Sequence, residues 1–146
     1  MTVPLNDTDF LHVAATTDQL STIRAFVRAH VSQAGFSELE TNNIVLAVDE
    51  ACANLIQHAY GNDPTKSIDL RIVMRPTEIN VEITDTSTPF DPKNAVLPDM
   101  RRYFAEHRHH GLGILLMTRV MDGIEYVPAG EGHPANTLIL TKLRTA

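Results

Sequence analysis

Hydrophobic and polar residues alternate along three stretches of the chain, and in one of them, residues 10–14, only partly. The clearest are residues 68–74 and 79–83, in which isoleucine, leucine, valine or methionine occupies every second position, with Val73 as an extra apolar residue. Such alternation predicts β-strands with one buried face. Only a short break that includes Pro76 separates these two strands, so we expect an antiparallel hairpin. Three further strands are predicted at residues 10–14, 123–127 and 137–143.

Apolar residues recur every three or four positions in two other stretches, which predicts amphipathic helices. The first helix, about 16 residues long, follows the N-cap candidates at 16–18 and stops at Gly35. The second begins at a capping box of Ser37 and Glu40 and ends near Gly61. Its apolar stripe consists of Ile44, Val48, Ala51, Leu55 and Ala59.

The remaining part of the chain completes the order of elements. Residues 86–110 are rich in proline, charge and histidine and predict a long loop, and a third helix at 111–123 follows. The order is strand, two helices, two strands, loop, helix and two strands, which is typical of an α+β sandwich. A doubly wound parallel sheet would need regular alternation of strands and helices. At this length we expect one domain, residues 1–146.

Composition excludes several classes of function. The formal charge of −6 disfavours binding along a nucleic-acid backbone, and no polybasic patch for a membrane surface is present. The single cysteine, Cys52, lies on the predicted apolar face and has no partner for an internal disulfide. No signal peptide and no apolar stretch of membrane-spanning length is evident, so we expect a cytoplasmic protein.

Three polar residues form a row on the second helix. Glu50, Asn54 and His58 recur at every fourth position, so a carboxylate, a carboxamide and an imidazole point the same way. The row borders the apolar stripe, where packing positions side chains that ligands can still reach. A carboxylate there suits proton transfer, and an amide oxygen suits a hard cation. The spacing alone is equally compatible with a partly solvated helix flank.

Two further signals lie outside this helix. Gly111 and Gly113 open the third helix, where glycines let a phosphate approach the first-turn N–H groups. No P-loop and no dinucleotide-binding glycine motif accompanies them. Asp85 ends a strand and could accept a hydrogen bond from an exocyclic amine, although taken singly such an aspartate is more often a turn former.

The order of these signals resembles the GHKL family of ATPases over nearly the whole chain. A helix with Glu-x-x-x-Asn comes first, then an aspartate at a strand end, then a long loop that closes on Gly-x-Gly. More narrowly, residues 49–60, 85–91 and 110–113 look like the N, G1 and G2 boxes of bacterial anti-sigma-factor serine/threonine kinases.

The resemblance implies a Bergerat-type two-layer sandwich, in which a mixed, mostly antiparallel sheet carries helices on one face. It also implies ATP or ADP and Mg²⁺ as ligands. Glu50 would be the general base and Asn54 would hold Mg²⁺. Asp85 would bind adenine with support from Thr137, and residues 91–110 would form the ATP lid. The other nucleotide-binding residues would be His58, Ser87, Phe90, His110, Gly111, Leu112 and Gly113.

The implied function is that of a kinase that switches between two protein partners. In one state it would bind a sigma factor, and in the other it would phosphorylate an anti-anti-sigma antagonist of the STAS type on serine or threonine. The resemblance also implies a homodimer, for which the first strand or the first helix could supply the interface. We expect no direct contact with nucleic acid or membrane.

Two alternatives stay open from the residues themselves. Ser87 stands where relatives usually carry glycine, and serine lacks the freedom of glycine at positive φ and could crowd the adenine pocket. That difference favours a non-catalytic module that binds nucleotide and regulates a partner by occupancy, whereas the retained Glu50 argues against it. The second alternative is a metal-dependent regulator, in which His107, His109 and His110 bind zinc or nickel with Cys52 or His133, at spacings of no standard motif.

Overall fold

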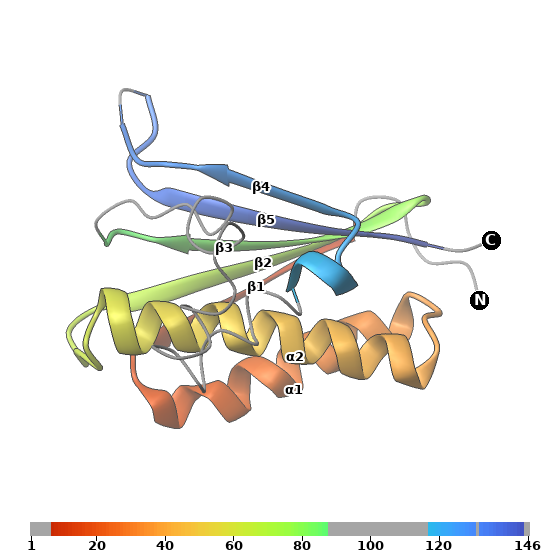
Figure 1. Cartoon of the computed structure of the whole chain (residues 1–146), viewed down its shortest axis with the longest axis horizontal. Coiled ribbons are helices and arrows are strands. Elements are labelled where there is room, and N and C mark those ends of the chain that lie inside the picture. The colour runs from red at the N-terminus through yellow and green to blue at the C-terminus, as the bar shows by residue number, and fades with distance from the viewer. Residues whose placement is uncertain (1–6, 88–116, 131, 145–146) are drawn as a thin grey trace, which may run out of the picture.

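A five-stranded antiparallel sheet forms one layer of the molecule and a pair of helices forms the other (Figure 1). This computed structural model describes residues 7–87, 117–130 and 132–144. The strands are β1 Asp7–Ala14, β2 Ser67–Met74, β3 Glu78–Asp85, β4 Gly123–Val127 and β5 Asn136–Leu143. Their order across the sheet is β1-β2-β3-β5-β4, so the last strand of the chain lies inside the sheet.

The strand pattern predicted from the sequence is confirmed. β2 and β3 form the expected antiparallel hairpin, with Leu70 opposite Ile83. Alternate residues of each strand point towards the helices and form the core, as the period of two requires. One continuous row of such residues crosses the whole sheet, from Leu11 through Leu70, Ile83 and Leu138 to Tyr126.

Two helices cover one face of the sheet. A single 3₁₀ turn, η1 Thr17–Gln19, leads into α1 Leu20–Gln33, and α2 Glu38–Asn54 packs beside α1 (Figure 1). The predicted capping box starts α2: the backbone N–H of Glu40 donates to Ser37 Oγ at 3.1 Å, and that of Ser37 donates to Glu40 Oε1 at 3.5 Å. The apolar stripes of both helices are buried against the sheet at Ile23, Val27, Val31, Ile44 and Val48.

The end of the second helix differs from the prediction. The α-helical part stops at Asn54 and widens into the π-helix η2 Leu55–Ala59, in which the N–H of Tyr60 donates to the carbonyl of Leu55 at 2.9 Å. A π-turn holds more residues than an α-turn, so positions beyond it rotate away from the regular stripe. Ala59, expected in the apolar stripe, is therefore exposed, while Ile56 fills the core.

The third predicted helix lies mostly outside the part of the chain that the structure describes. Residues 117–120 are helical, and Met117 and Met121 are buried in the same core as the sheet and the two long helices. This short turn thereby joins β4 to the helical layer. Cys52 is fully buried, as expected, and burial raises the pKa of its thiol.

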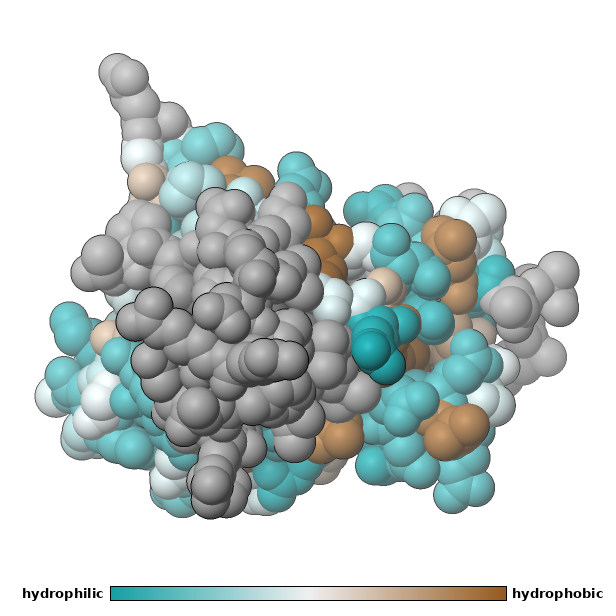
Figure 2. Space-filling view, viewed as in Figure 1, coloured by the Kyte–Doolittle hydropathy of each residue, from teal (hydrophilic) through white to brown (hydrophobic). Residues whose placement is uncertain are grey.

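The described surface is mainly polar. Figure 2 shows small, separate apolar patches among hydrophilic side chains. The large apolar residues that are exposed are Phe10, Leu39, Leu46 and Leu143. Among the helices described, none has the length and hydrophobicity needed to cross a membrane.

Candidate functional site

The site begins with two polar residues one turn apart on α2. Glu50 and Asn54 are both partly buried, and the intervening Ala51, Cys52 and Ala53 are packed into the protein. The helix is thus held by its neighbours while the two polar side chains stay accessible. The row predicted from the sequence is present for these two residues, which occupy its α-helical part.

Burial raises the pKa of Glu50, and the adjacent charge of Asp49 raises it further. Partial loss of water disfavours the ionised form of a carboxyl group, and a like charge nearby acts in the same direction. Asp49 is itself held by Arg24, whose guanidinium lies 3.0 Å from its Oδ1. A carboxylate with a raised pKa is a stronger base than an ordinary glutamate, which suits it to accept a proton.

His58, the third member of the row, belongs to the π-helix and is exposed. The change of helix type between Asn54 and His58 breaks the regular spacing on which the prediction rested. Single π-turns are often found at functional sites. The contribution of His58 to nucleotide binding stays a prediction.

Tyr60 connects this helix end to the end of β3. Its hydroxyl accepts a hydrogen bond from the N–H of Thr86 at 2.7 Å and lies 3.2 Å from Thr86 Oγ1. Since Thr86 directly follows Asp85, the contact places the end of this helix beside the end of β3 that carries Asp85. The motif spacing contained no signal for this contact.

Asp85 is buried, with 5% of its surface exposed, and Ser87 contacts it directly. The N–H of Ser87 donates to Asp85 Oδ1 at 2.9 Å, and the Ser87 hydroxyl donates to the same oxygen. Within the described ranges, Asn62 is the only non-glycine residue with positive φ, so Ser87 has an ordinary backbone conformation. The position therefore does not need the conformational freedom of glycine.

The fifth strand places Asn136, rather than Thr137, opposite Asp85. Asn136 is fully buried, and its Nδ2 donates to Asp85 Oδ1 at 3.1 Å. Thr137 pairs with Thr84, and alternation puts these two residues on the other face of the sheet. The register thus favours Asn136 as the β5 residue beside Asp85. Sequence reasoning missed it because only the register distinguishes adjacent strand residues.

Several predicted site residues lie outside the described residues: Phe90, the lid 91–110, His107, His109, His110, Gly111, Leu112 and Gly113. Of the two residues proposed to complete a zinc or nickel site, Cys52 is buried in the core and His133 is exposed. In the described parts of the chain, no group of three or more histidine, cysteine, aspartate or glutamate side chains could hold a metal ion.

The donor set fits magnesium in a nucleotide complex. Mg²⁺ keeps several waters and is commonly bound by one or two protein oxygens together with substrate phosphates. Asn54 offers one amide oxygen for this role, and Glu50, one turn away, is left as a base. A dedicated cage of protein ligands is not needed for such an ion.

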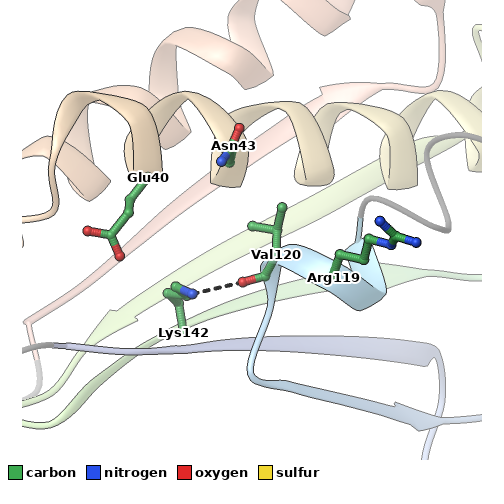
Figure 3. A pocket seen from close by; sticks show the side chains of 5 residues that line it. All are labelled: Glu40, Asn43, Arg119, Val120 and Lys142. Atoms are coloured by element: carbon green, nitrogen blue, oxygen red, sulfur yellow. Dashed lines mark hydrogen bonds between the residues drawn. The ribbon is translucent and has the colours of Figure 1, made fainter.

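A separate hollow of about 340 Å³ lies at the other end of α2 (Figure 3). It is lined by Glu40, Asn43, Arg119, Val120 and Lys142. The ammonium group of Lys142 donates to the carbonyl of Val120 at 2.9 Å and lies 3.6 Å from Asp122 Oδ2, so this cation is already paired. Glu40 is engaged in the capping box. The hollow is distinct from the Glu50, Asn54 and Asp85 site.

The chain is similar to known proteins in sequence and in fold. Serine-protein kinase RsbW of Bacillus subtilis is 27% identical over 144 residues, which cover 94% of this chain and 87% of that protein. The structure of the RsbU and RsbW domains of Rv1364c from Mycobacterium tuberculosis superposes with a TM-score of 0.64 at 16% identity, over 96% of this chain and 33% of that one. The SiaB–SiaC complex from Pseudomonas aeruginosa gives 0.63 at 12% identity, over 92% of this chain and 88% of the matched one.

The family model for the histidine kinase-like ATPase domain matches residues 13–142. That range runs from β1 to β5 and includes Glu50, Asn54 and Asp85. The chain therefore belongs to the histidine kinase-like ATPase domain family.

Proposed function

We propose that this protein is an ATP-dependent serine/threonine kinase that acts as an anti-sigma factor in a partner-switching module. It binds a sigma factor in one state and phosphorylates an anti-anti-sigma antagonist of the STAS type in the other. The observation that carries the proposal is the carboxyl group of Glu50, whose pKa is raised, one helical turn from Asn54. A protein that only binds nucleotide has no need for such a base.

Each site residue has its own role in the proposed phosphate transfer. Glu50 accepts the proton of the serine or threonine hydroxyl as that oxygen bonds to the γ-phosphorus of ATP and the bond to the β-phosphate oxygen breaks, releasing ADP. Asn54 would hold Mg²⁺ through its amide oxygen, and the ion would supply positive charge to offset that of the phosphates. Asp85 accepts a hydrogen bond from the adenine amine, and Tyr60 fixes the backbone beside it.

The names of similar proteins support the choice of partners. The Bacillus subtilis relative is named a serine-protein kinase, and the Pseudomonas aeruginosa neighbour was solved in complex with SiaC. An antagonist protein as the phosphate acceptor agrees with both. A cytoplasmic homodimer, with β1 or α1 at its interface, completes the proposal.

Transfer of γ-phosphate tests this function directly. Purified protein is incubated with γ-labelled Mg²⁺-ATP and a panel of STAS-type antagonist proteins from the same genome. We expect one antagonist to be labelled on serine or threonine. Glu50→Gln should reduce the initial rate at least about a hundredfold, the size of a general acid–base contribution. Asn54→Ala should also reduce the rate, because the phosphates lose the residue proposed to hold their Mg²⁺.

Two variants on the same helix serve as matched controls. Glu38→Gln and Asn42→Ala change exposed residues of α2 and should leave the transfer rate nearly unchanged. ATP binding without transfer to any antagonist would instead support the non-catalytic module. The ordinary backbone conformation of Ser87 argues against that module at one point, the need for glycine at positive φ. Absence of nucleotide binding by the wild-type protein would contradict both functions.

A further inference from the structure

We propose that Asn136 and Ser87 are positioning residues that aim one oxygen of Asp85 at the nucleobase and so make the site select a base with an amine at that point. The inference rests on the proposed nucleotide site. It concerns residues that do not themselves touch the reacting phosphate. It adds a specificity device to the binding function assigned to Asp85.

The two oxygens of Asp85 have different surroundings. Oδ1 accepts three hydrogen bonds: one from the N–H of Ser87 at 2.9 Å, one from the Ser87 hydroxyl, and one from Asn136 Nδ2 at 3.1 Å. For Oδ2, the described part of the chain supplies no hydrogen-bond donor. The three contacts therefore fix the rotation of the carboxylate and leave Oδ2 without a donor from the described residues.

A buried carboxylate oxygen with no donor among the described residues is unfavourable, because the group has given up water without gaining a full set of partners there. Only 5% of Asp85 is exposed, so bulk solvent cannot compensate freely. A ligand that presents an N–H to Oδ2 removes this deficit. A ligand that presents a carbonyl there places two acceptors against each other, and the site rejects it.

Asn136 is itself held in one orientation. Its Nδ2 donates to Asp85 Oδ1 and, at 2.8 Å, to the carbonyl of Ser87, while its Oδ1 accepts the N–H of Ala129 at 2.8 Å. Reversal of the amide would put an oxygen against two acceptors and an NH₂ group against a donor. The side chain thus joins the end of β3, the residues that follow β3 and the connection between β4 and β5.

Ser87 contributes the hydroxyl that glycine lacks. Glycine and alanine at this position would keep the backbone N–H that reaches Oδ1, but the serine hydroxyl adds a second donor from the same residue. The serine thereby supports the orientation of Asp85 instead of crowding the base. Asn136 and Ser87 donate to the same oxygen and together orient the carboxylate of Asp85.

Equilibrium binding of two nucleotides tests the proposal. The probes are ATP and purine riboside 5′-triphosphate, which lacks the amine at position six. We expect wild-type protein to prefer ATP by about tenfold, roughly the value of one hydrogen bond to a charged group. Asn136→Ala should lower the affinity for ATP by a similar factor and leave the affinity for the other nucleotide nearly unchanged. Ser87→Ala should lower the preference about threefold.

Asn80→Ala is the matched control. Asn80 is also a buried strand asparagine, bonded to Thr141, Glu78 and Arg75, but it lies at the far end of β3 from Asp85. The Asn80→Ala variant should lose stability as Asn136→Ala does, but it should keep the wild-type preference for ATP. If Asn136→Ala does not fold, the ratio of the two nucleotide affinities of Ser87→Ala tests the proposal.

Each other outcome counts against a defined claim. If wild type binds both nucleotides equally, or if Asn136→Ala weakens both by the same factor, the positioning role is wrong while the nucleotide site stands. If wild type binds neither nucleotide, the proposed function fails together with the inference.

Discussion

Glu50 shows at the scale of one residue how stability and activity oppose each other. Its raised pKa means that the folded protein binds the proton of this carboxyl group more tightly than the unfolded chain does. The stabilisation linked to that proton is complete below the unfolded pKa and is lost as pH rises through the folded pKa. At neutral pH, ionised Glu50 therefore lowers the free energy of unfolding.

Glu50→Gln should accordingly raise the melting temperature at pH 7 while it abolishes phosphotransfer. The gain should disappear when melting is measured near pH 4, where Glu50 of the wild type is protonated. Glu125→Gln, an exposed strand residue, should change the melting temperature little at either pH. A lower melting temperature of Glu50→Gln at pH 7 would contradict the destabilising effect of ionised Glu50.

The same shift predicts the acid limb of the transfer rate. Glu50 must be ionised to accept a proton, so the rate should fall as pH drops through a pKa above the ordinary glutamate value of 4.5. A profile of the single-turnover rate against pH, with ATP and antagonist saturating, measures that pKa. A midpoint at or below 4.5 would show that burial does not act on the catalytic group.

The sequence predicted which site residues lie together where their spacing along one helix determines it. Glu50 and Asn54 share an α-helix, so a period of four was sufficient to place them together. Asn136 and Tyr60 were not predictable in this way. Their contacts depend on the register between β3 and β5 and on the π-helical end of the second helix. Local sequence patterns predict neither feature.

At the scale of the element, the two ends of the second helix contrast. The start was predicted because Ser37 and Glu40 form a local motif with a known geometry. The π-turn at the other end has no comparable local signature. It lies where Ile56 packs in the core and where Tyr60 contacts the residue after β3.

Tyr60→Phe tests whether this helix end holds the base-binding segment. The change leaves the N–H of Thr86 without its partner, which should cost about 1 kcal/mol of stability. We also expect several-fold weaker ATP binding, because the residues around Asp85 lose an anchor. Urea unfolding and nucleotide titration measure the two effects.

Ser37→Ala provides the comparison. Loss of the N-cap at the distant start of α2 should also cost about 1 kcal/mol, with no change in affinity for ATP. Equal affinities for Tyr60→Phe and Ser37→Ala would mean that Tyr60 contributes stability alone.

At the scale of the whole molecule, the sheet and both helices share one core. The class of fold and the β2–β3 hairpin followed from hydrophobic periodicity and from the order of the elements. The position of β5 between β3 and β4 did not, because periodicity identifies strands without saying which ones pair. Only the resemblance to a known family supplied the two-layer arrangement in advance.

Leu70→Ala tests the unity of this core. Leu70 is fully buried in the row that crosses the sheet, so its truncation should cost roughly 2–5 kcal/mol in urea unfolding. Leu39→Ala, at a residue that is 70% exposed, should change stability by less than about 0.5 kcal/mol. Separate transitions for the sheet and the helices in Leu70→Ala would contradict a single cooperative unit.

The central place of β5 has a consequence for synthesis on the ribosome. β3 is translated long before β5, its neighbour in the sheet, so its pairing edge stays open while about fifty further residues are made. β4 emerges in that interval, yet among the described strands its partner is β5 alone. Newly made chains must therefore wait for Asn136–Leu143 before the sheet can close, and during this interval chaperones have an unpaired strand edge to protect.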